Sequence, residues 1–237
     1  MLPASHLDSP SRAASSFDRI RTMPGVLRLV EIAPAAPGDE VAAAGFSLGW
    51  ARAAAKDGLM LWAAPARFFA EHGDPCAEGL AQFGVDLERF FIVRTRTQID
   101  ALWAAEQGLS IAGAFVLCAI APAPKPLDLI VTRRLFLAAK KNSSRCALIR
   151  LDAVRASAAE ARFSVSPAPA ENSVYGLGPP AFDVRLARRR AGPAGEVWRL
   201  QWCPHEHAFK AIARPLDGDM APLPADRPAA ASWPCAG

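Results

Sequence analysis

Apolar and polar positions alternate along this chain in two different ways, and the change between them predicts its architecture. Up to about residue 151, apolar runs of strand length alternate with segments of helical period. The predicted strands cover residues 26–32, 59–63, 90–94, 114–119 and 147–151. The predicted helices cover residues 40–55, 66–82 with an interruption at 73–75, 98–109 and 128–141. This alternation is typical of a parallel sheet with crossover helices on both faces.

Past residue 160 the apolar positions recur every second residue, which is the period of a strand with one buried face. Three such segments cover residues 162–166, 182–190 and 196–202, and a Gly/Pro-rich turn at 191–195 separates the last two. We therefore expect an antiparallel extension at one edge of the sheet. The predicted fold class is α/β, with a mostly parallel sheet flanked by helices and a C-terminal antiparallel β extension.

Both ends of the chain lack apolar periodicity. Residues 1–24 are rich in Ser, Pro and Ala and predict a flexible leader, while residues 215–237 predict a disordered Pro/Ala-rich tail. Residues 25–214 are then one folded domain, and 237 residues with 51% hydrophobic content suffice for a large core. We expect a cytoplasmic location, because the sequence shows neither a signal peptide nor a membrane-length apolar run. Five scattered cysteines favour reduced thiols over a disulfide framework.

The first strand, loop and helix resemble the start of a nucleotide-binding domain, but the phosphate-binding loop is missing. Residues 33–39 contain no G-x-x-x-x-G-K-[ST] pattern, and Asp39 and Glu40 would repel a phosphate at the helix N-terminus. The central strand 114–118 ends in Cys118, where an ATPase needs an acid. We therefore predict no catalytic residue and no cofactor. A divergent ATPase that binds nucleotide through its backbone alone remains an alternative.

Two other motifs suggest chemistry only weakly. Gly45 to Gly49 match the G-x-S-x-G pattern of hydrolases, but the preceding alanine-rich run favours a helix, in which Ser47 and the glycines are small packing residues. On a continuous strand, Cys203, His205 and His207 would share one side as zinc ligands. Pro204 interrupts that strand and no fourth ligand is evident, so no metal site is predicted.

The net charge is +4, and the basic residues gather in three clusters. These are the candidate contacts for a partner or for DNA, with a plain solvated face as the alternative. No more than two of the three consecutive arginines in the last cluster can point to one face of a strand. The clusters are Arg133 with Arg134, Lys140 with Lys141, and Arg188 with Arg189 and Arg190.

Taken together, many short stretches resemble one family, in order and with similar spacing, over about residues 25–212. The matching segments are residues 30–31, 42–48, 61–62, 79–80, 83–86, 93–94, 100–106, 127–129, 133–135, 137–139, 158–159, 162–169 and 176–180. On these segments the chain resembles the ImuA family of bacterial DNA-damage-inducible mutagenesis proteins, which are distantly related to RecA and to the cell-division inhibitor SulA.

The resemblance implies a RecA-like core without a reliable ATPase site, which works with an ImuB-type protein and an error-prone C-family polymerase to copy across DNA lesions. It also implies that the segment 45–49 is a helix. Three departures from the family pattern are Gln107 and Gly108 after Glu106, Cys118 where an acid is common, and a short leader.

The predicted function is therefore that of a non-catalytic adaptor for a mutasome component or for DNA-bound RecA in SOS-induced translesion synthesis. A direct single-stranded DNA-binding module is a further alternative. Trp103, Trp198 and Trp202 are the aromatic candidates for an exposed contact surface, although the spacing of Trp103 from Ile99 equally suits burial.

Overall fold

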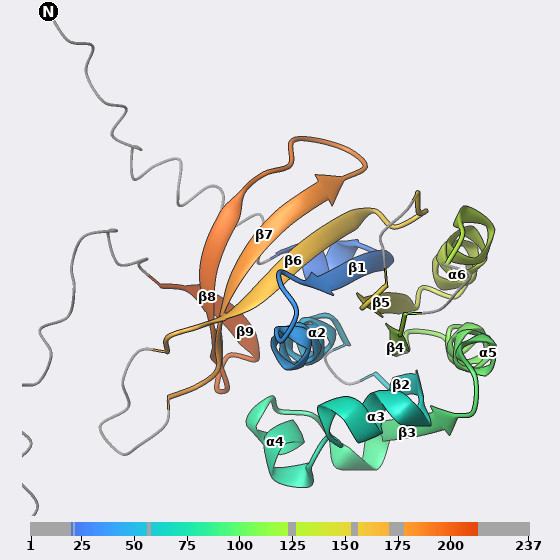
Figure 1. Cartoon of the computed structure of the whole chain (residues 1–237), viewed down its shortest axis with the longest axis horizontal. Coiled ribbons are helices and arrows are strands. Elements are labelled where there is room, and N and C mark those ends of the chain that lie inside the picture. The colour runs from blue at the N-terminus through green and yellow to red at the C-terminus, as the bar shows by residue number, and fades with distance from the viewer. Residues whose placement is uncertain are drawn as a thin grey trace, which may run out of the picture.

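Within the residues that the structure describes, nine strands form a single mixed sheet (Figure 1). The structure is a computed structural model, and it describes residue 20 and residues 22–55, 58–122, 127–152, 156–170 and 178–212. The strand order is β3-β2-β4-β5-β1-β6-β7-β8-β9. The strands are β1 (Leu29–Pro34), β2 (Met60–Pro65), β3 (Phe90–Thr95), β4 (Phe115–Ile120), β5 (Arg145–Arg150), β6 (Ala161–Ala168), β7 (Ala181–Arg189), β8 (Val197–Cys203) and β9 (Ala208–Ala211).

The mode of strand pairing changes once along this sheet, from parallel to antiparallel. Neighbours from β3 to β6 pair in parallel, whereas the pairs β6–β7, β7–β8 and β8–β9 are antiparallel. β6 thus joins a helix-connected parallel half to a hairpin-connected half. This confirms the predicted fold class, including its antiparallel extension.

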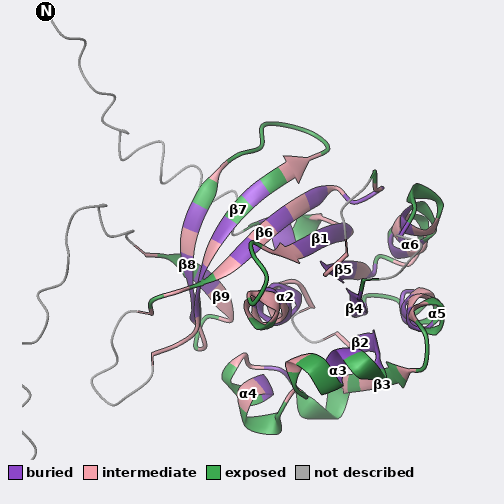
Figure 2. Cartoon of the chain, in the orientation of Figure 1, coloured by how far each residue is buried: buried purple, intermediate pink, exposed green. Residues whose placement is uncertain are grey.

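Helices cover both faces of the parallel half (Figure 1). They are α2 (Glu40–Ala55), α3 (Ala66–His72), α4 (Ala77–Gln82), α5 (Gln98–Gly108) and α6 (Leu129–Lys141), with a short 3₁₀ helix η1 (Leu87–Arg89). One core cluster lies on the α2 side and contains α2, α3 and α4 residues, while a second contains buried α5 and α6 residues. The strands between them are largely buried, and the outer sides of α5 and α6 are exposed (Figure 2).

Helix α2 lies close to the antiparallel strands because its inner face carries small residues. A Cβ atom added to Gly49 would lie 2.7 Å from Cζ of Phe209, on β9. A Cβ added to Gly45 would lie 3.5 Å from Phe182, at ordinary contact distance. Ser47 is fully buried and its hydroxyl donates a hydrogen bond to the Ala43 carbonyl at 2.7 Å. The G-x-S-x-G segment is therefore part of a packed helix, as the alanine-rich sequence predicted.

A buried ion cluster joins the two halves of the sheet. Glu31, in the middle of β1, accepts hydrogen bonds from Arg150 of β5 and from both Nε and Nη2 of Arg162 on β6. Glu31 is fully buried, and Arg150 is 1% exposed and also binds Asp152 through two hydrogen bonds. Buried charges of this kind are tolerated only when each has its partner.

Every predicted strand and helix is found, with boundaries that shift by a few residues. The predicted interruption at 73–75 separates α3 from α4. β9 was not predicted, because its four residues are too few to show a period. Residues 22–26 are helical and Met23 is 3% exposed, so the ordered body extends into the predicted leader. Residues 1–19 and the whole predicted tail, 215–237, lie outside the described residues.

Candidate functional site

The loop between β1 and α2 occupies the place of a phosphate-binding loop, and its backbone donors are already used. Ala35 donates its N–H to the Val165 carbonyl at 2.8 Å, and Asp39 donates to the Ala36 carbonyl at 3.1 Å. Pro34 and Pro37 have no N–H to offer. The two remaining donors bind carboxylates: Ala36 N–H reaches Asp39 and Gly38 N–H reaches Glu40, at 3.1 and 2.9 Å.

These two carboxylates therefore accept the backbone hydrogen bonds that a bound phosphate accepts in an active loop. A phosphate group would have to displace them and then remain beside their charges, which repel it. The residue types alone predict the repulsion, whereas the hydrogen bonds between the carboxylates and the loop depend on the three-dimensional structure.

An ATPase also needs an acidic residue at the end of a central strand, and this chain has Cys118 there. Cys118 on β4 is fully buried, and its Sγ lies 3.8 Å from the Ala101 carbonyl oxygen. Burial raises the pKa of its thiol to about 12, so the group is neutral at physiological pH. A neutral thiol cannot hold Mg²⁺ or orient a water as a carboxylate does.

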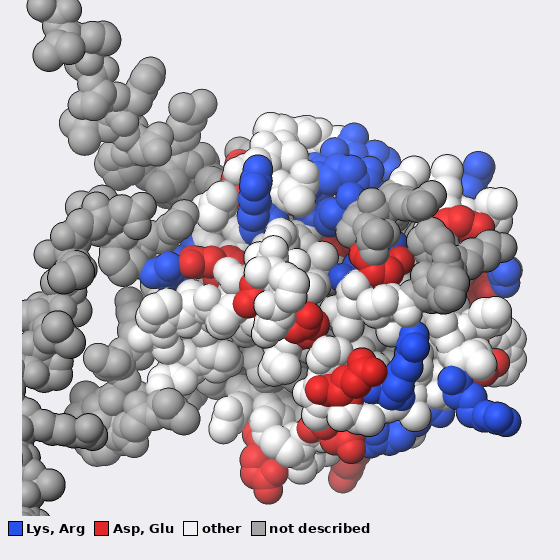
Figure 3. All heavy atoms as spheres, in the orientation of Figure 1, with Lys and Arg blue, Asp and Glu red and all other residues white. Residues whose placement is uncertain are grey.

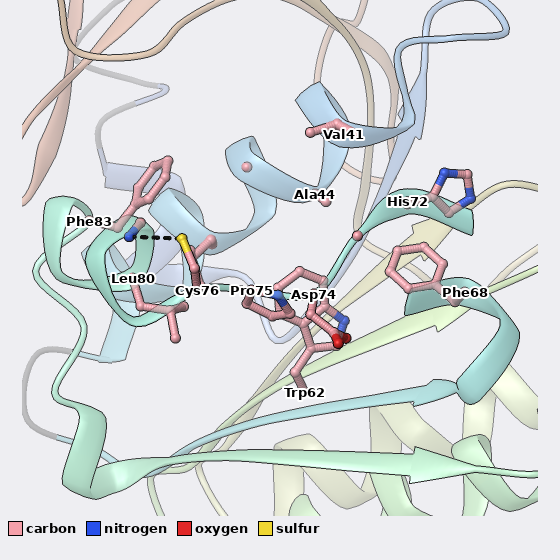
Figure 4. Close-up of a pocket in the computed structure, with 14 residues that line it drawn as sticks. Val41, Ala44, Trp62, Phe68, His72, Asp74, Pro75, Cys76, Leu80 and Phe83 are labelled. Carbon is pink, nitrogen blue, oxygen red and sulfur yellow. Dashed lines mark hydrogen bonds between the residues drawn. The ribbon is translucent and has the colours of Figure 1, made fainter. Parts of the chain in front are cut away.

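A hollow of about 220 Å³ lies between α2 on one side and α3 and α4 on the other (Figure 4). Its lining is mainly apolar, with Trp62, Phe68 and Leu80 among the larger side chains. His72 and Asp74 also line it, and the Asp74 carboxylate accepts a hydrogen bond from Arg94. No lysine or arginine is among its lining residues, so it offers little to a triphosphate.

A groove of about 190 Å³ lies between α5 and α6. Leu102, Trp103, Val131 and Leu135 contribute apolar side chains to it, together with Ile99. Trp103 is 63% exposed and Ile99 is 77% exposed. Of the three tryptophan candidates, Trp103 alone has the exposure expected of a contact residue. We call the outer sides of α5 and α6, with this groove, the α5–α6 face.

The prediction of an exposed contact surface is wrong for the two tryptophans on the C-terminal strands. Trp198 and Trp202 were candidates for an exposed surface, but they are only 6% and 1% exposed. Trp202 packs against Phe83 and Phe209 with ring centroids 5.4 and 5.1 Å apart, and its indole N–H donates to the Gln82 carbonyl. Both side chains point to the α2 side of the sheet. The period of two along a strand does not show which of its faces is buried, so the sequence could not predict this.

Four of the predicted contact residues lie on α6 and are exposed: Arg133, Arg134, Lys140 and Lys141. Arg134 forms an ion pair with Glu106 of α5, across the groove. The other three have no ion-pair partner among the described residues. Figure 3 shows basic side chains on the side of the molecule where α6 lies.

The remaining three predicted contact residues, Arg188 to Arg190, lie at the end of β7, where basic side chains are dense (Figure 3). Arg188 donates hydrogen bonds to the carbonyls of Ser157 and Ala159, and Arg190 donates to that of Ala158. The Arg190 guanidinium also lies 4.8 Å from the centre of the Phe136 ring. Burial and the neighbouring Arg162 lower the pKa of Arg188. Two of these three arginines therefore hold the adjacent loop, in addition to any contact with a partner.

Of the three residues considered as zinc ligands, His207 has a defined partner in the structure. His207 lies in the turn before β9, where its Nδ1 is 2.8 Å from Nη2 of Arg52. Burial and this guanidinium lower the pKa of His207. Among the residues that the structure describes, no group of three His, Cys, Asp or Glu side chains could hold a metal ion.

None of the described helices is long and apolar enough to cross a membrane. No protein-family model matches the chain. Among solved structures, the chain is similar to the RadB recombinase, with a TM-score of 0.50, 13% identity and coverage of 79% of this chain and 91% of that chain. SulA from Pseudomonas aeruginosa is also found, with a TM-score of 0.39, 18% identity and coverage of 52% of this chain and 96% of that chain.

The sheet order and the likeness to RadB define the class: this is a RecA-like α/β protein, and its phosphate loop is closed by its own carboxylates. Protein ImuA from two strains of Caulobacter vibrioides is 32% identical over 187 residues, which are 73% of this chain and 73% of that protein. The chain belongs to the ImuA family. This membership confirms the family identified from the sequence and links the chain to DNA-damage-inducible mutagenesis.

Proposed function

We propose that this chain is a non-catalytic RecA-like accessory protein of SOS-induced, error-prone translesion synthesis. In this role it is an adaptor that holds an ImuB-type protein, an error-prone C-family polymerase or RecA, and it needs no cofactor of its own. The family membership supports the process, and the RecA-like scaffold supports a role among recombinase-like proteins.

The observation that carries the proposal is the internal bonding of the phosphate loop. Each backbone N–H from Ala35 to Asp39 that exists donates within the chain, and two of the acceptors are the side chains of Asp39 and Glu40. An ATPase needs these donors free and needs a cation beside them. A RecA-like fold that lacks free loop donors and a cation beside them supports a role in binding a partner.

The contact residues that we propose for partners or DNA are those of the three basic clusters. Arg133, Lys140 and Lys141 are the most available, because they are exposed and have no ion-pair partner among the described residues. Arg134 and the cluster from Arg188 to Arg190 contribute positive charge around them.

Equilibrium titration of the purified chain with a fluorescent ATP analogue and Mg²⁺ tests the absence of catalysis. We expect no saturable binding at micromolar analogue and no phosphate release. The variant Asp39→Ala/Glu40→Ala frees the donors of Ala36 and Gly38, so a gain of binding in this variant alone would support the cause that we assign. Saturable, Mg²⁺-dependent binding by the unmodified chain would refute the proposal and favour the divergent ATPase.

Co-purification with an ImuB-type protein from the same cells, after DNA damage, tests the adaptor role. The variant Arg133→Glu/Arg134→Glu should lose this partner, while Arg185→Glu/Lys210→Glu, which makes the same charge change on exposed residues of β7 and β9, should keep it. Titration with single-stranded DNA at two salt concentrations separates the DNA-binding alternative, because phosphate contacts weaken steeply as salt rises.

A further inference from the structure

The α5–α6 face exposes more large apolar surface than a solvated pair of helices needs. Ile99 and Trp103 on α5 are 77% and 63% exposed, and Ile130 on α6 is 70% exposed. Isolated exposed apolar side chains are common in folded proteins, but Ile99 and Trp103 line one groove, and Ile130 precedes Val131, which lines the same groove from α6. A grouped apolar surface of this kind marks an interaction site.

The outer face of α6 carries one row of apolar and basic side chains. On α6, Ile130, Arg134, Leu137 and Lys141 follow at spacings of four, three and four residues, so they share the outer face of the helix. Leu137 is 52% exposed. Apolar and basic side chains therefore alternate along one row, and a partner must match both.

The charge of this face is predominantly positive. The carboxylate of Asp100 is held in the capping box of α5 by Thr97, and Asp128 caps α6 through the Val131 N–H. Glu106 is paired with Arg134. The acids of this face are therefore bound locally, whereas Arg133 and the two lysines of α6 have no ion-pair partner among the described residues.

We propose that the groove between α5 and α6 receives an amphipathic helix of another protein, with an apolar stripe flanked by acidic side chains. Two helices side by side form a groove in which a third can pack, with anchors three or four residues apart. A second copy of this chain fits less well, because pairing two such faces would bring their unpaired cations together. Nucleic acid fits less well because Ile99 and Ile130 offer nothing to phosphates.

The proposal rests on the adaptor function, since it names the kind of partner that one surface takes. Its test is a selection of peptides of about 20 residues, displayed as a random library, on the purified full-length chain; this length spans several helical turns. A parallel selection uses the variant Trp103→Glu/Ile130→Glu. Both residues are exposed, so the variant should fold, and circular dichroism and urea unfolding verify this.

We expect the unmodified chain to enrich acidic sequences with apolar residues at helical spacing, and the variant not to enrich them. A selected peptide should lose at least tenfold in affinity, measured by fluorescence anisotropy, with Trp103→Glu/Ile130→Glu. It should also weaken severalfold with Arg133→Glu/Lys140→Glu. The control variant Leu87→Glu, at a 47% exposed apolar residue outside the groove, should bind as the unmodified chain does.

Three outcomes would overturn the inference. The first is enrichment of the same peptides on the groove variant, or of peptides without acidic flanks. The second is a concentration-dependent dimer in sedimentation that Trp103→Glu/Ile130→Glu abolishes, and the third is DNA binding that the same variant abolishes. The nucleotide titration is independent of these, so ATP turnover with intact peptide binding would refute the adaptor function and leave the groove assigned.

Discussion

Two glycines on one helix provide a matched test of how α2 packs. We compare Gly49→Ala with Gly45→Ala, because both substitutions add one methyl group to the interior of the same helix. The new methyl at Gly49 would lie 2.7 Å from Phe209 Cζ and 3.1 Å from Trp202 Cε3, while that at Gly45 meets nothing nearer than 3.5 Å. Phe209 cannot move aside easily, since its ring stacks on Phe46 at 4.9 Å.

The expected magnitudes follow from two opposing terms. Replacing glycine by alanine in a helix interior stabilises it by about 0.8–1 kcal/mol. Forcing an extra methyl into a packed core costs about 1–3 kcal/mol. Gly45→Ala should therefore raise the free energy of unfolding by up to about 1 kcal/mol, and Gly49→Ala should lower it or leave it unchanged. Because the helix term is common to both, the difference between the variants isolates the clash at about 1–3 kcal/mol.

Urea unfolding followed by the fluorescence of the buried tryptophans measures this difference, with circular dichroism as a second probe of two-state behaviour. Equal stabilities for the two variants, or a more stable Gly49→Ala, would refute the close approach of α2 to β9. The same result would remove the packing explanation for the G-x-S-x-G segment.

Other predictions follow from buried charges and thiols. Glu31→Gln should lower the free energy of unfolding by about 3–5 kcal/mol, because two arginines lose a buried carboxylate. Glu106→Gln, which breaks the exposed ion pair with Arg134, should lower it by no more than about 1 kcal/mol, and urea unfolding compares the two variants. Cys118 should resist a thiol reagent in the native state, while exposed Cys76 reacts. The pKa of Cys118 is raised to about 12, so the stability of the fold should decrease as pH rises above about 9, because only the unfolded thiol then ionises. The lowered pKa of His207 means that stability falls as pH decreases below about 6.5, where the unfolded state binds a proton that the folded state refuses; thermal unfolding across pH, with His207→Gln as control, measures it.

Much of the candidate site could be anticipated from the chain because it consists of local features. The missing phosphate-loop pattern, Cys118 at the end of its strand and the four cations on α6 each depend on neighbours in sequence. The exposure of Trp103 could not be predicted, since both packing and contact suit its helical spacing. The burial of Trp198 and Trp202 could not be predicted, because apolar residues at every second position show that a strand has two different faces. They do not show which of those faces α2 covers.

By itself, the sequence determined the order of strands and helices along the chain, the change from parallel to antiparallel pairing and the absence of a phosphate-loop motif, because these follow from short-range periodicity and from the residue types present. Tertiary structure decided that Asp39 and Glu40 bind the donors of their own loop, that Glu31 gathers two arginines from distant strands, and that α5 and α6 leave an apolar groove exposed. Each of these depends on groups that are brought together by sheet order and helix docking. No local pattern in the chain specifies such distances.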